Sequence, residues 1–122
     1  LKLNKIEMTR QYKERVFQFF KTNPLTRDRY EMLKKLIRFK NQFPMIQNFW
    51  VADDRIYIQT FMERDEKYAF YICRLDGEIL GKRFIPVQYS DPTRISPAAV
   101  ADNAFYQLTE GEEDWELHRS EF

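Results

Sequence analysis

The feature that most constrains the fold is a stretch that recurs after 49 residues. Val51-Ala52-Asp53 returns as Val100-Ala101-Asp102. The match continues without a gap into the positions that follow, at Tyr57/Tyr106, Thr60/Thr109, Glu63/Glu112 and Asp65/Asp114. A period of roughly 40 to 50 residues built from short strands is typical of proteins that stack small sheets. We therefore expect two related sheet modules in this chain.

The composition is that of a folded domain. With 122 residues the chain has the length of one domain and can bury a moderate core. Hydrophobic residues make up 43% and charged residues 32%, which excludes a disordered chain. No apolar run approaches the roughly 18 residues that span a bilayer, so membrane insertion is not expected. No targeting segment is visible. Because the first residue is Leu rather than Met, we expect a processed or truncated piece of a longer protein, from which a signal sequence could have been removed.

Two residues are candidates for a chemical role, the one cysteine and the one histidine. Cys73 excludes an internal disulfide, and we expect it to be a small buried hydrophobe rather than a reactive thiol. His118 is predicted to point outward, opposite Trp115 and Leu117, and to serve at a surface or interface rather than as a catalytic base. No second His, Cys or Asp stands at the spacing of a zinc site or a catalytic triad. We therefore expect no catalytic residues, no metal and no cofactor.

The first third of the chain has the pattern of a helical hairpin. After a short alternating stretch at residues 1–6, Thr9 is a suitable N-cap for a helix from Arg10 to about Lys21. This helix should end before Pro24, because the residue before a proline avoids the helical conformation. A second helix is expected from the cap Thr26 to residue 40, with an inward face made of Tyr30, Leu33, Leu36 and Ile37.

The outward face of the second predicted helix carries Lys34, Lys35 and Arg38, which could neutralise phosphates. Residues 1–40 hold 12 Lys or Arg against 4 Asp or Glu, a net charge of +8, whereas residues 41–122 hold 8 against 15, a net charge of −7. The acidic part would repel a phosphate backbone, and no known nucleic-acid motif is present. Nucleic acid is therefore not the partner we expect, and the opposite charges favour contact between the two halves or with different partners.

After residue 43 the hydrophobic period changes from that of a helix to that of strands. Strands are predicted at residues 48–53, 55–62, 68–75 and 79–86, with Asp76-Gly77 as a hairpin turn. Both sides of this antiparallel meander are apolar, whereas a sheet with one wet face would alternate with polar residues. The sheet should therefore be covered on both faces, by a neighbouring sheet on one side and by a sheet or the helices on the other.

The remaining chain is predicted to hold a loop and a second meander. Residues 88–97 contain two prolines and several turn formers and are expected to form a loop. Strands then follow at 98–101, 104–109 and 115–119, with a charged turn at 111–114. The chain thus divides into a strand remnant and helical hairpin (1–43), a four-stranded meander (44–87), a loop (88–97) and a three-stranded partial module (98–122). The predicted fold class is α+β, mainly β.

The acidic pairs at the start of the two modules allow two interpretations. Asp53-Asp54 and Asp102-Asn103 offer oxygen ligands of the kind that Ca²⁺ prefers. However, both pairs stand where the meander must reverse, and Asp and Asn hydrogen-bond to their own backbone in such turns. The turn interpretation is therefore favoured over a calcium site.

The residues quoted above resemble those of six-bladed β-propeller proteins of bacteria and archaea related to the NHL-repeat type. The resemblance rests on the hydrophobic-Ala-Asp-Asp-x-Ile-Tyr-Ile opening at 51–58, on the segment at 71–81 and on the closing Ala-Phe-Tyr-Gln-Leu pattern. It covers residues 44–122 and implies one full and one partial blade, preceded by a helical insertion. It also implies an extracytoplasmic or secreted prokaryotic protein. A glycine frequent in this family is replaced by Asp54-Arg55 and Asn103-Ala104.

This resemblance leaves three functions open. The leading one is a non-enzymatic scaffold that binds proteins or ligands, with the remaining blades of a parent propeller or a second copy as its partner. The others are part of a propeller hydrolase or lyase whose catalytic residues lie elsewhere, and a free-standing α+β protein-interaction module. Open strand edges favour self-association. The candidate interaction surface is formed by Lys34, Lys35, Arg38, Glu112, Glu113 and Trp115.

Overall fold

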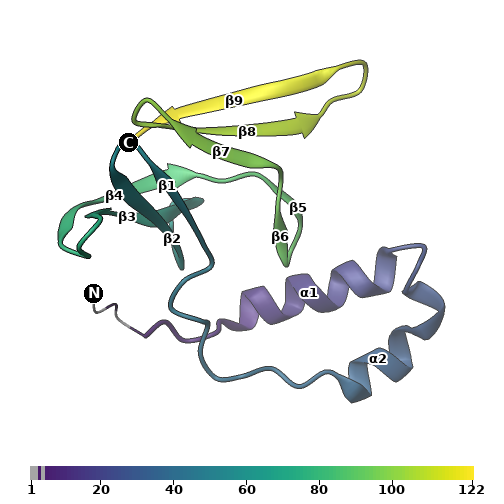
Figure 1. Ribbon diagram of the computed structural model, residues 1–122. Helices are drawn as coiled ribbons and strands as arrows, with labels where there is room; N and C mark the ends of the chain where they lie inside the picture. Colours follow the sequence, from purple (N-terminus) through teal and green to yellow (C-terminus); the bar gives the residue numbers. More distant parts are fainter. Residues whose placement is uncertain (1–2, 4) are drawn as a thin grey trace.

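The computed structural model describes residues 3 and 5–122, which form an α+β fold that is mainly β (Figure 1). Two helices come first and antiparallel sheets of four, two and three strands follow. The bounds of the helical elements are α1 (Arg10–Thr22), η1 (Arg27–Arg29) and α2 (Tyr30–Leu36). The strands are β1 (Asn48–Ala52), β2 (Arg55–Arg64), β3 (Lys67–Arg74), β4 (Ile79–Pro86), β5 (Tyr89–Asp91), β6 (Arg94–Ile95), β7 (Ala98–Ala101), β8 (Ala104–Glu110) and β9 (Trp115–Glu121).

Helix α1 begins and ends where its sequence predicts. The side chain of Thr9 accepts a hydrogen bond from the Tyr12 backbone N–H at 3.1 Å, which caps the first turn. Asn23, the residue before Pro24, leaves the helical conformation and ends the helix. Val16 is the buried residue of its apolar face.

Helix α2 is shorter than its sequence predicts, and this prediction is corrected. The expected helix from Thr26 to residue 40 is a 3-10 turn followed by seven helical residues that end at Leu36, and Leu36 is exposed rather than inward. Thr26 does not cap it, because its hydroxyl donates instead to the Phe20 carbonyl oxygen at 2.7 Å. After Leu36 the chain becomes extended. Phe39 packs edge-on against Phe17 of α1, with the ring centres 5.3 Å apart.

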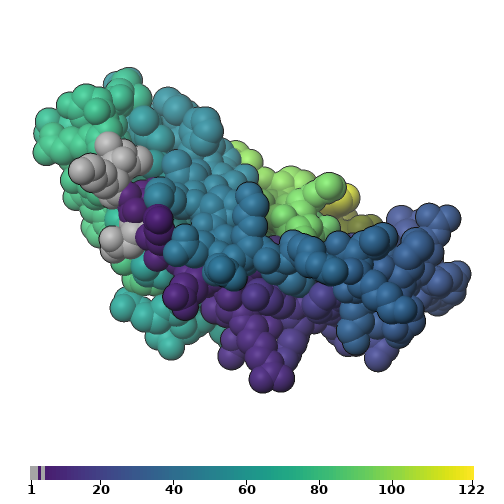
Figure 2. All heavy atoms as spheres, turned by 90° about the horizontal axis from the view of Figure 1, so that it is seen from below, coloured from purple at the N-terminus to yellow at the C-terminus, as the bar shows by residue number. Residues whose placement is uncertain are grey.

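The return segment, residues 37–47, pairs with the residues that precede α1. Glu7 and Gln42 form an isolated antiparallel bridge, and the Phe43 N–H donates to the Ile6 carbonyl oxygen. Figure 2 shows α1, α2 and this return segment together on one side of the molecule. The strand expected at residues 1–6 falls partly on residues 1, 2 and 4, which lie outside the described residues. No helix within residues 3 and 5–122 is long and apolar enough to cross a membrane.

Sheet 1 consists of β1 to β4 in chain order and is antiparallel throughout, as the meander pattern predicts. The turn between β1 and β2 is formed by Asp53 and Asp54, both at positive φ, which is the geometry of a two-residue hairpin. Sheet 2 consists of β7, β8 and β9. Its strands β7 and β8 pair in the same register as β1 and β2 of sheet 1. There Asp102 and Asn103 occupy the same positive-φ positions.

The segment at 88–97 is not the simple loop that its prolines predict. Strands β5 and β6 form a small hairpin within it. The buried side chain of Gln107 holds this hairpin, because its amide oxygen accepts from the Gln88 N–H at 2.6 Å and its amide nitrogen donates to the Gln88 and Ser96 carbonyl oxygens at 2.9 and 3.1 Å. A glutamine of the second module therefore orders the connection between the two sheets.

The main core lies between the two sheets. Phe70 of sheet 1 and Phe105 of sheet 2 have ring centres 5.1 Å apart, and both are almost fully buried. Trp50 and Phe122 close around them, with ring centres 5.3 and 6.4 Å from that of Phe105. Aromatic rings thus supply most of the contact, as the aromatic-rich composition suggests.

Candidate interaction surface

The six residues of the predicted interaction surface do not form one surface. Lys34 and Lys35 lie on α2, whereas Glu112, Glu113 and Trp115 lie at the β8–β9 turn, on opposite sides of the molecule in Figure 1. No ion pair between the two groups exists in the described part of the chain.

Two of the three cations already have local contacts. The Lys34 ammonium lies 5.8 Å from the centre of the Tyr30 ring. The Arg38 guanidinium donates to the carbonyl oxygens of Lys35 and Ile37, which lie at the C-terminus of α2. Cations at this end of a helix satisfy its free carbonyl groups. Arg38 therefore has a structural role at the end of α2.

A different surface is prominent on sheet 2. Because side chains alternate along a strand, the register of β8 and β9 places four apolar side chains on the side that faces away from sheet 1. Leu117 and Trp115 are 67% and 60% exposed. This bare face of sheet 2 consists of Tyr106, Leu108, Trp115 and Leu117. Contiguous exposed apolar side chains of this kind mark interaction sites.

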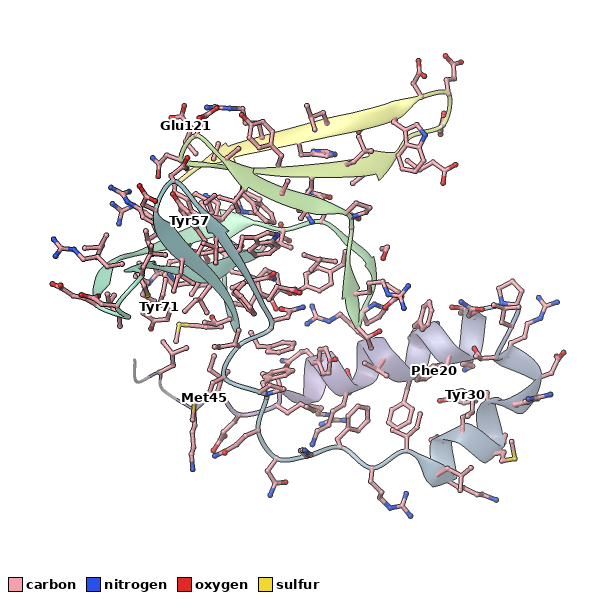
Figure 3. All side chains as sticks on the ribbon, viewed as in Figure 1. Phe20, Tyr30, Met45, Tyr57, Tyr71 and Glu121 are labelled. Atoms are coloured by element: carbon pink, nitrogen blue, oxygen red, sulfur yellow. The ribbon has the colours of Figure 1, made fainter. Side chains whose placement is uncertain are left out.

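The repeat shows which part of sheet 1 corresponds to this bare face. Tyr106 is the equivalent of Tyr57, which is fully buried between the two sheets (Figure 3). Tyr57 packs on Phe122 with ring centres 4.6 Å apart. The side that sheet 1 buries against sheet 2 is therefore the side that sheet 2 leaves exposed.

The opposite side of sheet 1 is covered only at its centre. Ile58 and Cys73 are buried there. Phe49 and Val51 on the edge strand β1 are 64% and 63% exposed. We call these two residues the rim of sheet 1. The prediction that both sides of the first meander are covered is thus right for the centre and wrong for the rim.

The rim, too, has a buried equivalent in the other module. Val51 corresponds to Val100, which packs into the core between the sheets. Both valines have the same place in their hairpins, since Val51 pairs with Ile56 and Val100 pairs with Phe105. Their burial differs because only Val100 has a neighbouring sheet against it.

A hydrogen bond links the two hairpin turns across the joint. The Asp53 carboxylate accepts from the Asn103 backbone N–H at 3.0 Å. The sequence predicts that these residues bond to their own backbone, so this contact between modules is a correction. Among the described residues no group of three or more His, Cys, Asp or Glu could hold a metal ion. The positive φ values of both pairs confirm that they form turns.

The Tyr57 hydroxyl is the one buried side-chain polar atom that has no hydrogen-bond partner in residues 3 and 5–122. Burial raises the pKa of Tyr57, and the nearby Asp53 charge raises it further, while Arg55 opposes both. A buried hydroxyl without a partner costs free energy. The joint therefore depends on apolar packing and on the Asp53 contact, and not on this hydroxyl.

The predictions for the cysteine and the histidine differ in how well they agree with the structure. Cys73 is fully buried, as predicted, and burial raises the pKa of its thiol. His118 lies on the opposite side of β9 from Trp115 and Leu117, as predicted, but that side is not the outward one, because it is shared with the buried Gln107. Its Nε2 lies 2.8 Å from the Thr109 hydroxyl, and its side chain is 38% exposed.

Of the bare face, only Trp115 belongs to the interaction surface predicted from the sequence; Tyr106, Leu108 and Leu117 do not. The signal that could reveal them is the repeat itself. Tyr57 and Tyr106 align, so the burial expected for one side of the first module marks an equivalent side of the second. Comparison with protein-family models, curated proteins and solved structures finds no match to this chain.

Proposed function

We propose that this protein is an interaction scaffold that stacks sheets, and that its partner is a further sheet of the same kind. That sheet belongs to another module of a longer protein or to a second copy of the chain. The single observation that carries the proposal is the joint between sheets 1 and 2. In it, the side of sheet 1 that bears Tyr57 packs against the side of sheet 2 that bears Phe105.

The two free surfaces repeat the two halves of this joint. The bare face of sheet 2 bears Tyr106, the equivalent of Tyr57, and the rim of sheet 1 bears Val51, the equivalent of Val100. The bare face therefore matches one half of the joint, and the rim matches the exposed edge of the other half. Surfaces of this kind associate head to tail, which gives rings or open stacks rather than a symmetric pair.

The hydrogen bond between the two turns also has an equivalent acceptor at the free end of sheet 2. Asp53 accepts from the Asn103 N–H inside the chain, and Asp102 is the equivalent acceptor at the free end. In a stack, the Asp102 carboxylate would accept from the N–H of Asp54 in the next sheet. A blade arrangement of the propeller type, which the sequence resemblance implies, is one such stack.

The proposal is tested with two variants that each block one surface. Leu117→Glu places a charge on the bare face of sheet 2, and Val51→Glu places one on the rim of sheet 1. Analytical ultracentrifugation over a wide concentration range should show association of the unmodified chain and monomers for each variant alone. An equimolar mixture of the two variants should form a 1:1 complex, because each retains the surface that the other lacks.

The matched control is Lys35→Glu, which introduces the same residue on α2, away from both surfaces, and should leave association unchanged. If the unmodified chain stays monomeric at high concentration, the partner is not a second copy of the chain. A mixture of the two variants that remains monomeric while the unmodified chain associates would contradict the head-to-tail arrangement.

A further inference from the structure

A cavity of about 440 Å³ lies between α1, the end of β2 and the β5–β6 hairpin, away from both stacking surfaces. Its volume is in the range of sites that hold small organic molecules. It forms because the chain brings together the start of the helical layer and the connection between the two sheets. Neither the stacking of sheets nor the proposed scaffold role uses it.

One wall of the cavity is aromatic. Phe43 is buried and stacks on Phe61, with ring centres 4.4 Å apart and nearly parallel planes. Tyr12 meets Phe43 edge-on at 4.8 Å. Tyr68 and Tyr89 form a second pair of rings, with centres 5.3 Å apart. All of these rings line the cavity.

Two of the three tyrosine hydroxyls already have partners. The Tyr89 hydroxyl donates to the Gln47 side-chain oxygen at 2.9 Å, and the Tyr68 hydroxyl donates to the Glu63 carboxylate at 3.3 Å. Burial raises the pKa of Tyr89 well above its ordinary value, so this hydroxyl stays neutral. Tyr68 and Tyr89 therefore present fixed ring faces, while the Tyr12 hydroxyl has no hydrogen-bond partner among the described residues.

The charged groups on the cavity wall sum to one negative charge. Arg15 and Glu63 are paired at 3.4 Å and neutralise each other. Asp91 also lines the cavity and makes no ion pair in the part of the chain that the structure describes. Its Oδ1 accepts from the Thr93 N–H at 2.8 Å and from the Thr93 hydroxyl at 2.7 Å. Burial opposes ionisation of Asp91, but these bonds and the charge of Arg94 outweigh it and hold its pKa below the ordinary value.

We propose that this cavity binds a small organic cation, namely a protonated amine with an aromatic or apolar body. The ammonium group contacts Asp91 Oδ2 and the free Tyr12 hydroxyl, and the apolar body lies against the rings of Phe61, Tyr68 and Tyr89. Tyrosine and phenylalanine faces attract cations as well as apolar groups, because the ring face carries negative charge. An anionic ligand is disfavoured by the same Asp91 carboxylate.

The probes for the test are three molecules of nearly equal shape and different charge. These are 2-phenylethylamine, which is a cation at neutral pH, 2-phenylethanol, which is neutral, and 3-phenylpropionate, which is an anion. Isothermal titration calorimetry at low salt should show that the amine binds at least tenfold more tightly than the alcohol, and that the propionate binds most weakly. NMR shift changes should concentrate on the rings of Tyr12, Tyr68 and Tyr89.

The decisive variant is Asp91→Asn, which keeps an oxygen for the Thr93 bonds and removes the charge. It should abolish the preference for the amine over the alcohol. The matched control is Asp114→Asn, which makes the same change in the β8–β9 turn and should keep the preference. Equal affinities for the amine and the alcohol in the unmodified chain, or a preference that survives Asp91→Asn, would overturn the proposal. Shift changes confined to residues outside the cavity would overturn it too.

Discussion

Sheets 1 and 2 are built from the same repeated hairpin, yet they differ in what covers them. Sheet 1 packs against sheet 2 on one side and is covered at the centre of its other side, so Tyr57 and Ile58, neighbours that point to opposite sides, are both buried. Sheet 2 has a neighbour on one side only, and Leu117 on its other side is 67% exposed. The difference shows that burial in this protein is set by the neighbour, and not by the repeat alone.

The largest expected effect is the difference in stability loss between a truncation on the covered side of sheet 2 and one on its bare face. Phe105→Ala should lower the free energy of unfolding by about 3–5 kcal/mol, because it empties the centre of the core. Leu117→Ala on the bare face should change it by less than about 0.5 kcal/mol. Urea unfolding followed by circular dichroism at low protein concentration measures both. Similar losses for the two variants would mean that the bare face is covered in the isolated chain.

Alkaline pH should lower the free energy of unfolding, because several tyrosines on or beside sheet 1 are buried. Burial raises the pKa values of Tyr12, Tyr57, Tyr68 and Tyr89, with the largest rise at Tyr89. Above the ordinary tyrosine value near pH 10 the unfolded chain loses these protons while the folded chain retains them, so the free energy of unfolding must fall as pH rises.

Urea unfolding between pH 8 and 11.5 measures this fall. Stability from these groups should be fully present below about pH 10 and should decline above it. Tyr89→Phe should make the decline less steep, because it removes the group with the largest shift. A decline of the same steepness in that variant would refute the assignment to Tyr89.

A smaller effect distinguishes the two equivalent aspartates. Asp53→Gly removes the acceptor of the Asn103 N–H, whereas Asp102→Gly removes a carboxylate at the free end of sheet 2. Both residues have positive φ, which Gly adopts freely, so the relief of backbone strain is the same in both variants. Asp53→Gly should be less stable than Asp102→Gly by about 1 kcal/mol, because it loses a hydrogen bond to a charged group.

Thermal unfolding at low protein concentration gives the difference between these two variants directly. If Asp102→Gly is the less stable of the two, the hydrogen bond between the turns does not hold the sheets together.

The smallest expected effect concerns the two equivalent tyrosines. Tyr57→Phe removes a buried hydroxyl that has no partner, so the variant should be as stable as the unmodified chain or more stable by up to about 1 kcal/mol. Tyr106→Phe removes a hydroxyl that accepts from the Arg119 side chain at 3.2 Å near the surface, and should be close to neutral. A clear loss of stability in Tyr57→Phe would show that its hydroxyl is bonded in solution, for example to water.

Much of the β structure could be predicted from the sequence because local signals there are strong. The strand expected at 79–86 has those bounds in the structure, and the expected strand at 55–62 extends by two residues to Arg64. Asp76-Gly77 marks the β3–β4 turn, where Gly77 has positive φ. Alternation and turn residues act over a few positions, so one sequence is sufficient to find them.

The parts that could not be predicted depend on contacts between distant residues. Helix α2 ends at Leu36 although Ile37 continues its periodicity, because the chain then places Phe39 on Phe17. The β5–β6 hairpin forms in a proline-containing stretch because Gln107 bonds to both ends of it. Tertiary contacts of this kind override local preference.

The candidate sites show the same limit. Lys34, Lys35 and Arg38 were grouped with Glu112 and Glu113 by charge, but charge alone does not say that two segments meet. The cavity beside α1 escaped prediction because its rings come from α1, the return segment, β2, β3 and β5. Asp91 lies in the stretch that its prolines predict to be a loop, and nothing in the sequence brings it together with the aromatic rings.

The three two-residue hairpin turns, Asp53-Asp54, Asp65-Glu66 and Asp102-Asn103, all place side chains in the left-handed region where glycine is at ease. Each of them therefore stores unfavourable backbone energy that glycine would release. At Asp53 this unfavourable energy is offset by the hydrogen bond that its carboxylate accepts from the Asn103 N–H. Glu66 makes no such contact with a described residue, which makes it the position where a glycine would raise the melting temperature without loosening the joint between the sheets.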